Sequence, residues 1–77
     1  MIIDVTDFNP HRFEEALGWL NATTGAATYK GDGTVVFSAD TWRVYKTENS
    51  IEGYYETTWF LEFDSDSDGT AFLLRWA

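Results

Sequence analysis

The chain has 77 residues, of which thirteen are Asp or Glu and five are Lys or Arg, so its formal net charge at pH 7 is −8. This length allows one domain, residues 1–77, built around one core. The chain contains no Cys, which excludes disulfides and thiolate zinc sites. The strong negative charge disfavours binding to nucleic acid or to an anionic membrane. It favours a basic protein as the partner, and the alternative is that the charge serves solubility alone.

Aromatic residues make up 18% of the chain and are the expected source of its stability. Each aromatic side chain buries about 150–250 Å² when it is interior, so these residues replace the disulfides or metals that stabilise many small domains. The first residues run directly into Asp4 without the apolar segment of a signal peptide, and no apolar run is long enough to span a membrane. We therefore expect a cytoplasmic protein that needs no cofactor and no metal.

We predict a helix from about Pro10 to Asn21. Asn9 is suited to cap it, and Pro10 suits the first helical position because its missing N–H would have no partner there. Phe8 and Phe13 have the spacing of a hydrophobic staple. The apolar residues then recur with helical period and form one stripe that can pack on a sheet: Phe13, Ala16, Leu17 and Leu20.

The remainder of the chain predicts antiparallel strands. Residues 26–30 and 34–38 flank Gly31-Asp32-Gly33, a short glycine-containing loop that is typical of a hairpin. The next strand is expected at residues 42–47, followed by a polar connection at residues 47–53. A short added edge strand is expected near the N-terminus, from Ile2, Ile3 and Val5.

The longest predicted strand runs from Tyr54 to Phe63. Its alternation places Trp59 on a core face, whereas the opposite face mixes aromatic and acidic side chains and therefore suits an interface. We expect an Asp-rich loop, residues 64–69, to close a hairpin onto a last strand at residues 70–77, with Leu74 opposite Trp59. The predicted fold is α+β, with one N-terminal helix packed on a four- to five-stranded antiparallel sheet.

Catalytic chemistry is not expected. His11 is the only histidine, and it lies beside a predicted helix N-terminus that disfavours a protonated ring. No serine has a recognisable base partner, and no glycine-rich phosphate loop is present. Asp64, Asp66, Asp68 and Gly69 match the opening of a calcium loop, but Arg75 occupies the twelfth position, where a bidentate Glu is needed. A weak calcium-binding module is therefore one alternative, and we assign no metal site.

Acidic side chains are concentrated in the predicted Asp-rich hairpin tip, in the polar connection and on the mixed face of the long strand. Carboxylates on one face of a strand recur every two residues, a spacing comparable to that of phosphates along a nucleic-acid strand, so an acidic face can occupy a basic nucleic-acid channel. Aromatic side chains near the centre would supply most of the affinity. The predicted partner-binding residues are Glu48, Glu52, Tyr54, Glu56, Phe60, Glu62, Asp64, Asp66 and Asp68.

The last part of the chain has a recognisable layout. Tyr55-Glu56-Thr57-Thr58-Trp59-Phe60-Leu61-Glu62-Phe63-Asp64 combines a Trp with following apolar residues and leads into an Asp-containing turn, after which Leu73-Leu74 lies in a last apolar strand. Over about the last 25 residues this resembles the uracil-DNA glycosylase inhibitors. The short, acidic, aromatic chain is also similar to other small bacteriophage inhibitors, the anti-CRISPR proteins. The upstream half differs, with one predicted helix where the glycosylase inhibitors have two.

This resemblance implies a DNA-mimic type of inhibitor that binds a nucleic-acid-processing protein in the host cell cytoplasm. Self-association is the alternative function: the mixed strand face would pair with a second copy, as in a homodimeric structural or accessory protein. Ionic strength separates the two hypotheses, because salt weakens steered binding to a basic partner but screens the repulsion between two acidic copies.

Overall fold

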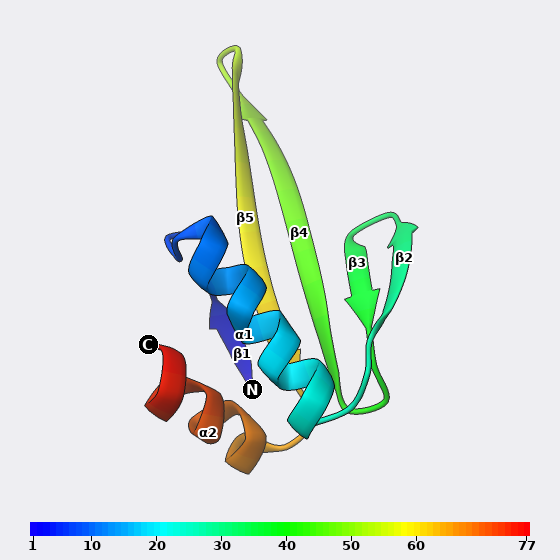
Figure 1. Ribbon diagram of the computed structural model, residues 1–77. Coiled ribbons are helices and arrows are strands. Elements are labelled where there is room, and N and C mark those ends of the chain that lie inside the picture. The colour runs from blue at the N-terminus through cyan, green and yellow to red at the C-terminus, as the bar shows by residue number, and fades with distance from the viewer.

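The computed structural model describes residues 1–77 and contains a five-stranded antiparallel sheet with two helices on one face (Figure 1). The strands lie in the order β1-β5-β4-β3-β2. The predicted α+β class is confirmed. In chain order the elements are β1 (Ile2–Asp4), α1 (Pro10–Thr23), β2 (Thr28–Asp32), β3 (Val35–Ser38), β4 (Trp42–Ile51), β5 (Tyr54–Phe63) and α2 (Asp66–Trp76).

Helix α1 begins at Pro10 as predicted and ends two residues beyond the expected Asn21. The side-chain oxygen of Asn9 accepts a hydrogen bond from the His11 amide over 2.9 Å, which satisfies one of the free donors of the first turn. The rings of Phe8 and Phe13 meet edge-on with centroids 6.5 Å apart, as expected of a hydrophobic staple. Local sequence signals therefore determine where this helix starts.

The predicted N-terminal edge strand and the first predicted hairpin are confirmed, although Val5 lies outside β1 and the hairpin turn lies at residues 33–34, since Gly31 and Asp32 belong to β2. Near the N-terminus, β1 pairs with β5, with Ile3 opposite Leu61, so that Ile3 is buried. At the other edge, β2 and β3 form the predicted hairpin, and an irregularity in their register lies between Tyr29 and Asp32. The longest hairpin, β4–β5, occupies the middle of the sheet.

The predicted polar connection at residues 47–53 is wrong, because β4 continues as far as Ile51. Glu52 and Gly53 form a two-residue turn with positive φ angles of 51° and 85°, the backbone geometry of a type I′ hairpin. β4 and β5 remain paired in unbroken register out to Ile51 opposite Tyr54. The cross-strand hydrogen bonds, and not an apolar alternation, keep these polar residues extended.

The predicted last strand at residues 70–77 is also wrong, because this segment belongs to α2. Ser65 caps the helix by accepting a hydrogen bond from the Ser67 amide. Leu74, expected opposite Trp59, is instead 84% exposed on α2. The strand neighbour of Trp59 is Lys46 of β4. The model therefore has a second helix that the sequence patterns did not indicate.

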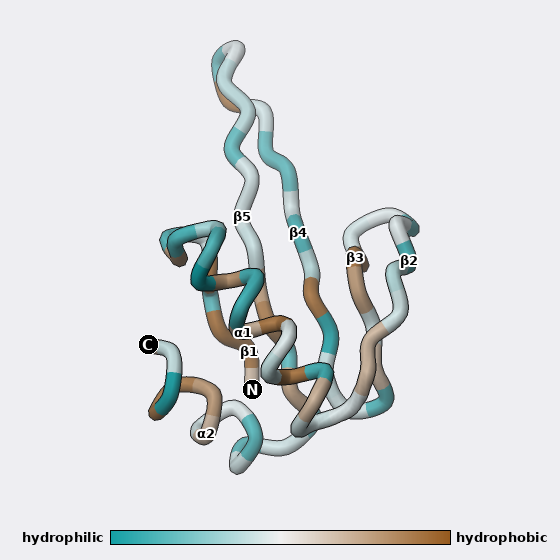
Figure 2. Tube along the Cα trace, in the orientation of Figure 1, coloured by the Kyte–Doolittle hydropathy of each residue, from teal (hydrophilic) through white to brown (hydrophobic).

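The core lies between the two helices and one face of the sheet. Phe72 of α2 is fully buried, and its ring lies 5.9 Å from that of Phe8 and 5.8 Å from that of Phe63. Trp59 points to this face as predicted and contacts Phe13 at its border. Hydrophobic segments gather where helices and sheet meet (Figure 2). The buried hydrophobic residues are Ile3, Val5, Ala16, Leu20, Trp42, Val44, Leu61, Phe63 and Phe72.

The helices have 14 and 11 residues. No helix in the protein combines the length and the apolar character that crossing a membrane requires.

We expect Phe72→Ala to lower the free energy of unfolding by about 3–5 kcal/mol, because it removes a fully buried ring from the centre of the core. Leu74→Ala is the matched control and should change it by less than about 0.5 kcal/mol, because Leu74 is exposed. Urea unfolding of both variants measures the difference. Equal losses would mean that Leu74 is buried, as in a strand, and would contradict α2.

Candidate functional site

The outer part of the β4–β5 hairpin projects beyond both helices as a two-stranded arm (Figure 1). We define the arm as residues 48–56, all of which are exposed. The molecule is correspondingly elongated, with principal extents of 41, 25 and 22 Å. Two-stranded ribbons without a packed face are only marginally stable by themselves, so the arm adds little to the core.

Large apolar side chains are exposed on both faces of the arm. Ile51 and Tyr54 lie opposite each other on the face turned away from the helices, where they are 59% and 74% exposed. Tyr55, opposite Ser50, lies on the other face and is 82% exposed. Solvent-exposed tyrosines of this kind serve protein interfaces well, because one end of the ring is apolar and the other is polar.

The arm carries three carboxylates and no basic residue: Glu48, Glu52 and Glu56. Only Glu48 has an ion-pair partner, with an oxygen 3.7 Å from Lys46 Nζ. Glu52 lies at the tip with a positive φ of 51°, a conformation that Asn or Gly adopts more easily. A carboxylate is thus held at the outermost turn at a conformational cost of about 1 kcal/mol.

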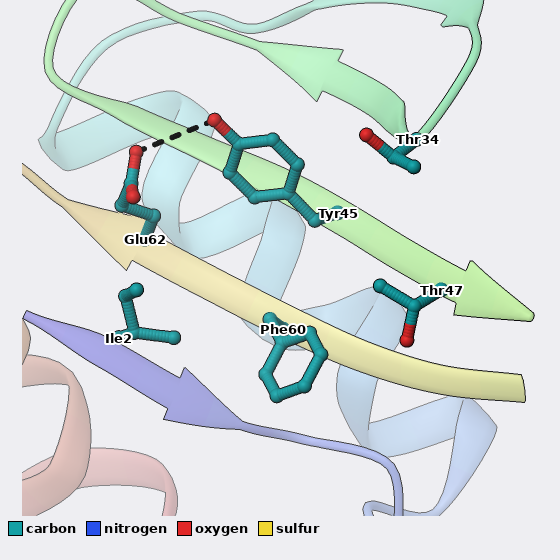
Figure 3. A pocket seen from close by; sticks show the side chains of 6 residues that line it. All are labelled: Ile2, Thr34, Tyr45, Thr47, Phe60 and Glu62. Atoms are coloured by element: carbon teal, nitrogen blue, oxygen red, sulfur yellow. Dashed lines mark hydrogen bonds between the residues drawn. The ribbon is translucent and has the colours of Figure 1, made fainter.

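The sheet face turned away from the helices is uncovered, and we call it the open face. It contains a shallow hollow of about 360 Å³ (Figure 3). The rings of Phe60 and Tyr45 and the side chain of Ile2 give it an apolar floor, and Glu62 borders it. Phe60 and Tyr54, both predicted partner-binding residues, therefore belong to the same face of β5.

Two of the predicted acidic residues are part of an ion-pair network. Arg43 Nη1 donates hydrogen bonds to Glu62 and, over 2.9 Å, to Asp64. Tyr45 donates its hydroxyl to the same Glu62 oxygen over 3.4 Å. Hydrogen bonding to Arg43 lowers the pKa of Asp64, and hydrogen bonds to Asp64 and then Glu62 raise the pKa of Arg43. Both carboxylates are thus engaged within the fold, and Arg43 compensates one of their two negative charges.

The predicted hairpin tip formed by Asp64, Asp66 and Asp68 is not present in the structure. Asp66 and Asp68 lie in the first turn of α2, where the helix dipole favours negative charge. Asp64 precedes the helix and binds Arg43. No three His, Cys, Asp or Glu side chains are placed so that they could hold a metal ion. The residues that match a calcium loop therefore form the start of α2 and not a loop.

Two acidic residues that the sequence analysis did not select lie beside the arm. Asp4 and Asp7 border a polar hollow of about 350 Å³ together with Glu56, because β1 pairs with the inner part of β5. The hydroxyl and the amide of Thr6 hydrogen-bond to Asp4 and lower its pKa. The predicted N-terminal edge strand could have indicated that these acidic residues lie near Glu56. That step required knowing that the strand pairs with β5. Acidic groups thus continue from this edge to the tip of the arm.

The basic residues lie mostly elsewhere. The Arg12 guanidinium stacks 5.1 Å from the ring centroid of Trp76, and that of Arg75 lies 5.6 Å from the ring of Trp19. These contacts join the outer parts of α1 and α2. The two helices therefore carry two cations and Lys46 lies at the base of the arm, whereas the arm itself carries none.

We expect Arg43→Gln to raise the pKa of Asp64 toward its ordinary range, because the hydrogen bond from Arg43 is the largest cause of its lowering. In the wild type the folded-state pKa is lower, so Asp64 stabilises the protein above about pH 4, and this contribution is lost as the pH falls through the folded-state pKa. The free energy of unfolding of the variant should therefore lack this part of its dependence on pH. NMR titration of the Asp64 carboxyl carbon measures the shift, and an unchanged midpoint in Arg43→Gln would contradict it.

Comparisons of the chain with protein-family models, with curated proteins and with solved structures found no match. The chemistry of the arm and the open face is therefore the basis for assigning a function.

Proposed function

We propose that this protein is an acidic inhibitor that binds the basic surface of a nucleic-acid-processing protein in the cytoplasm and blocks access of nucleic acid to it. It acts by stoichiometric binding, without catalysis or a cofactor, and does not itself bind nucleic acid. The arm is the observation that carries this proposal. It holds three carboxylates and exposed aromatic side chains outside the core, where they contribute little to folding.

Charge accounts for the encounter with the partner. A net charge of −8 and an arm without cations attract a basic surface and raise the association rate. Salt screens this attraction over about 8–10 Å at physiological ionic strength. The projecting arm brings its carboxylates within that distance before the rest of the protein arrives. Steering therefore acts mainly through the arm.

Aromatic side chains account for most of the affinity. Tyrosine is enriched among the residues that dominate interface energies, and Tyr54 and Tyr55 are more exposed than any other tyrosine of the chain. Phe60 and the apolar floor of the open-face hollow extend the same surface toward the core. The predicted residues Glu56, Phe60 and Tyr54 fit this surface best.

The conformation of Glu52 supports a function for the charge at the tip. Asn-Gly or Asp-Gly is the usual pair in a type I′ turn, whereas this turn has Glu52 before Gly53. Strained residues tend to occur at functional sites. Contact with a basic partner would explain why a longer acidic side chain occupies this position.

Homodimer formation through the open face is disfavoured by the same charges. In such a dimer Glu52 at the tip and Glu56 on the open face of each arm would bring four carboxylates together without a compensating cation in either arm. We therefore favour a basic partner over a second copy. Concentration-dependent association in the purified protein that strengthens with salt would support the homodimer instead.

The proposed function can be tested with the immobilised protein and a lysate of its native host. We expect it to retain a basic, nucleic-acid-binding protein, and we expect short duplex DNA or single-stranded RNA to displace that protein. The triple variant Glu48→Gln, Glu52→Asn, Glu56→Gln should associate with the retained protein about tenfold more slowly at low salt, with a flatter salt dependence. Asn suits the positive φ at position 52, so the variant should fold.

The matched control is Glu14→Gln, Glu15→Gln, Asp40→Asn, which removes three exposed carboxylates outside the arm. Both variants change the formal net charge from −8 to −5, so they differ only in where the charge is lost. The control should slow association by less than about twofold, because steering depends on charges near the contact. Equal slowing by the two variants, or retention of proteins that nucleic acid does not displace, would contradict the proposal.

A further inference from the structure

We infer that the arm enters a cleft of the partner and becomes buried on both faces, and that it does not lie flat on the partner's surface. The inference rests on the proposed function, since it specifies how the same partner is bound. It follows from three features of the arm: its side chains, its free edges and its width.

The side chains of the arm are divided between two opposite faces. Tyr54 and Ile51 point to one face, and Tyr55 points to the other. A flat docking surface would cover one tyrosine and leave the other in water. Only a partner with two walls contacts both, and neither tyrosine is covered by the protein itself.

Both outer edges of the arm are free of neighbouring strands. On one side, β1 pairs with β5 only as far along the hairpin as Phe60. On the other side, β3 pairs with β4 only as far as Tyr45. The outward backbone N–H and C=O groups of the arm are therefore available to a partner. In a cleft, these backbone groups can form hydrogen bonds with the partner along the edges of the ribbon, while Tyr54 and Tyr55 pack against the partner on the two faces.

The width and charge of the arm fit a cleft that normally holds nucleic acid. Neighbouring strands are about 4.8 Å apart, so the backbone of the ribbon is narrower than duplex DNA, and the tyrosine side chains that extend from its two faces span the remaining distance to the two walls. Glu52 leads at the tip, followed by Glu48 and Glu56 on opposite faces. The cleft that fits this arrangement has basic walls on both sides.

Photo-crosslinking distinguishes a cleft from a flat surface. We would replace Tyr54 or Tyr55, one at a time, with the crosslinking residue p-benzoylphenylalanine in the full chain and irradiate each protein in the host lysate. Both positions should crosslink to the same protein, and both crosslinks should disappear when duplex DNA is added. The controls carry the same residue at Tyr29 or Leu74, which are exposed but lie outside the arm, and should not crosslink to it.

A second experiment measures binding affinity after each tyrosine is replaced by a small side chain, so no bulky probe is present at the interface. Tyr54→Ser and Tyr55→Ser should each weaken binding of the retained protein by about tenfold, as expected for two anchoring residues. Crosslinking or loss of affinity at only one of the two positions would overturn the inference and leave the proposed function intact. Retention of no nucleic-acid-displaceable protein would overturn both.

Discussion

Two short helices cover one face of the sheet over only part of its length. The buried hydrophobic residues, from Ile3 to Phe72, form one cluster, and its centre is the contact of Phe72 with Phe8 and Phe63. The chain is too short to cover the other face or the outer hairpin as well. Those surfaces must remain in water, and they are where the arm and the open face are found.

The negative charge serves two different purposes in this arrangement. Asp64 and Glu62 bind Arg43, and Asp66 and Asp68 occupy the first turn of α2, so these carboxylates contribute to the fold. The carboxylates of the arm have no comparable structural role, since only Glu48 has an ion-pair partner. Asp64 and Glu62 are therefore engaged within the fold, whereas Glu52 and Glu56 have no ion-pair partner in it.

The sequence predicted those parts whose signals are local. Asn9, Pro10 and the Phe8–Phe13 staple identified α1, and strict alternation identified β5 with its core face. It did not predict α2, because Asp64 to Gly69 has the composition of a turn, although Ser65 with Asp68 three residues later has the spacing of a helix start. The outer half of β4 was not predictable from its polar residues, since pairing with β5 keeps it extended. Of the predicted partner-binding residues, Glu48, Glu52, Tyr54 and Glu56 lie together in the arm, whereas the Asp-rich segment lies elsewhere.

In the proposed function the arm serves binding, and the remainder of the chain suffices for folding. Deleting the arm tests it most directly: residues 48–57 are replaced by Asn-Gly, which joins Thr47 to Thr58, two residues that already lie opposite each other. We expect the shortened protein to have a free energy of unfolding within about 1 kcal/mol of the wild type and to lose the nucleic-acid-displaceable partner completely. A shortened protein that still retains this partner, or one that no longer folds, would contradict it.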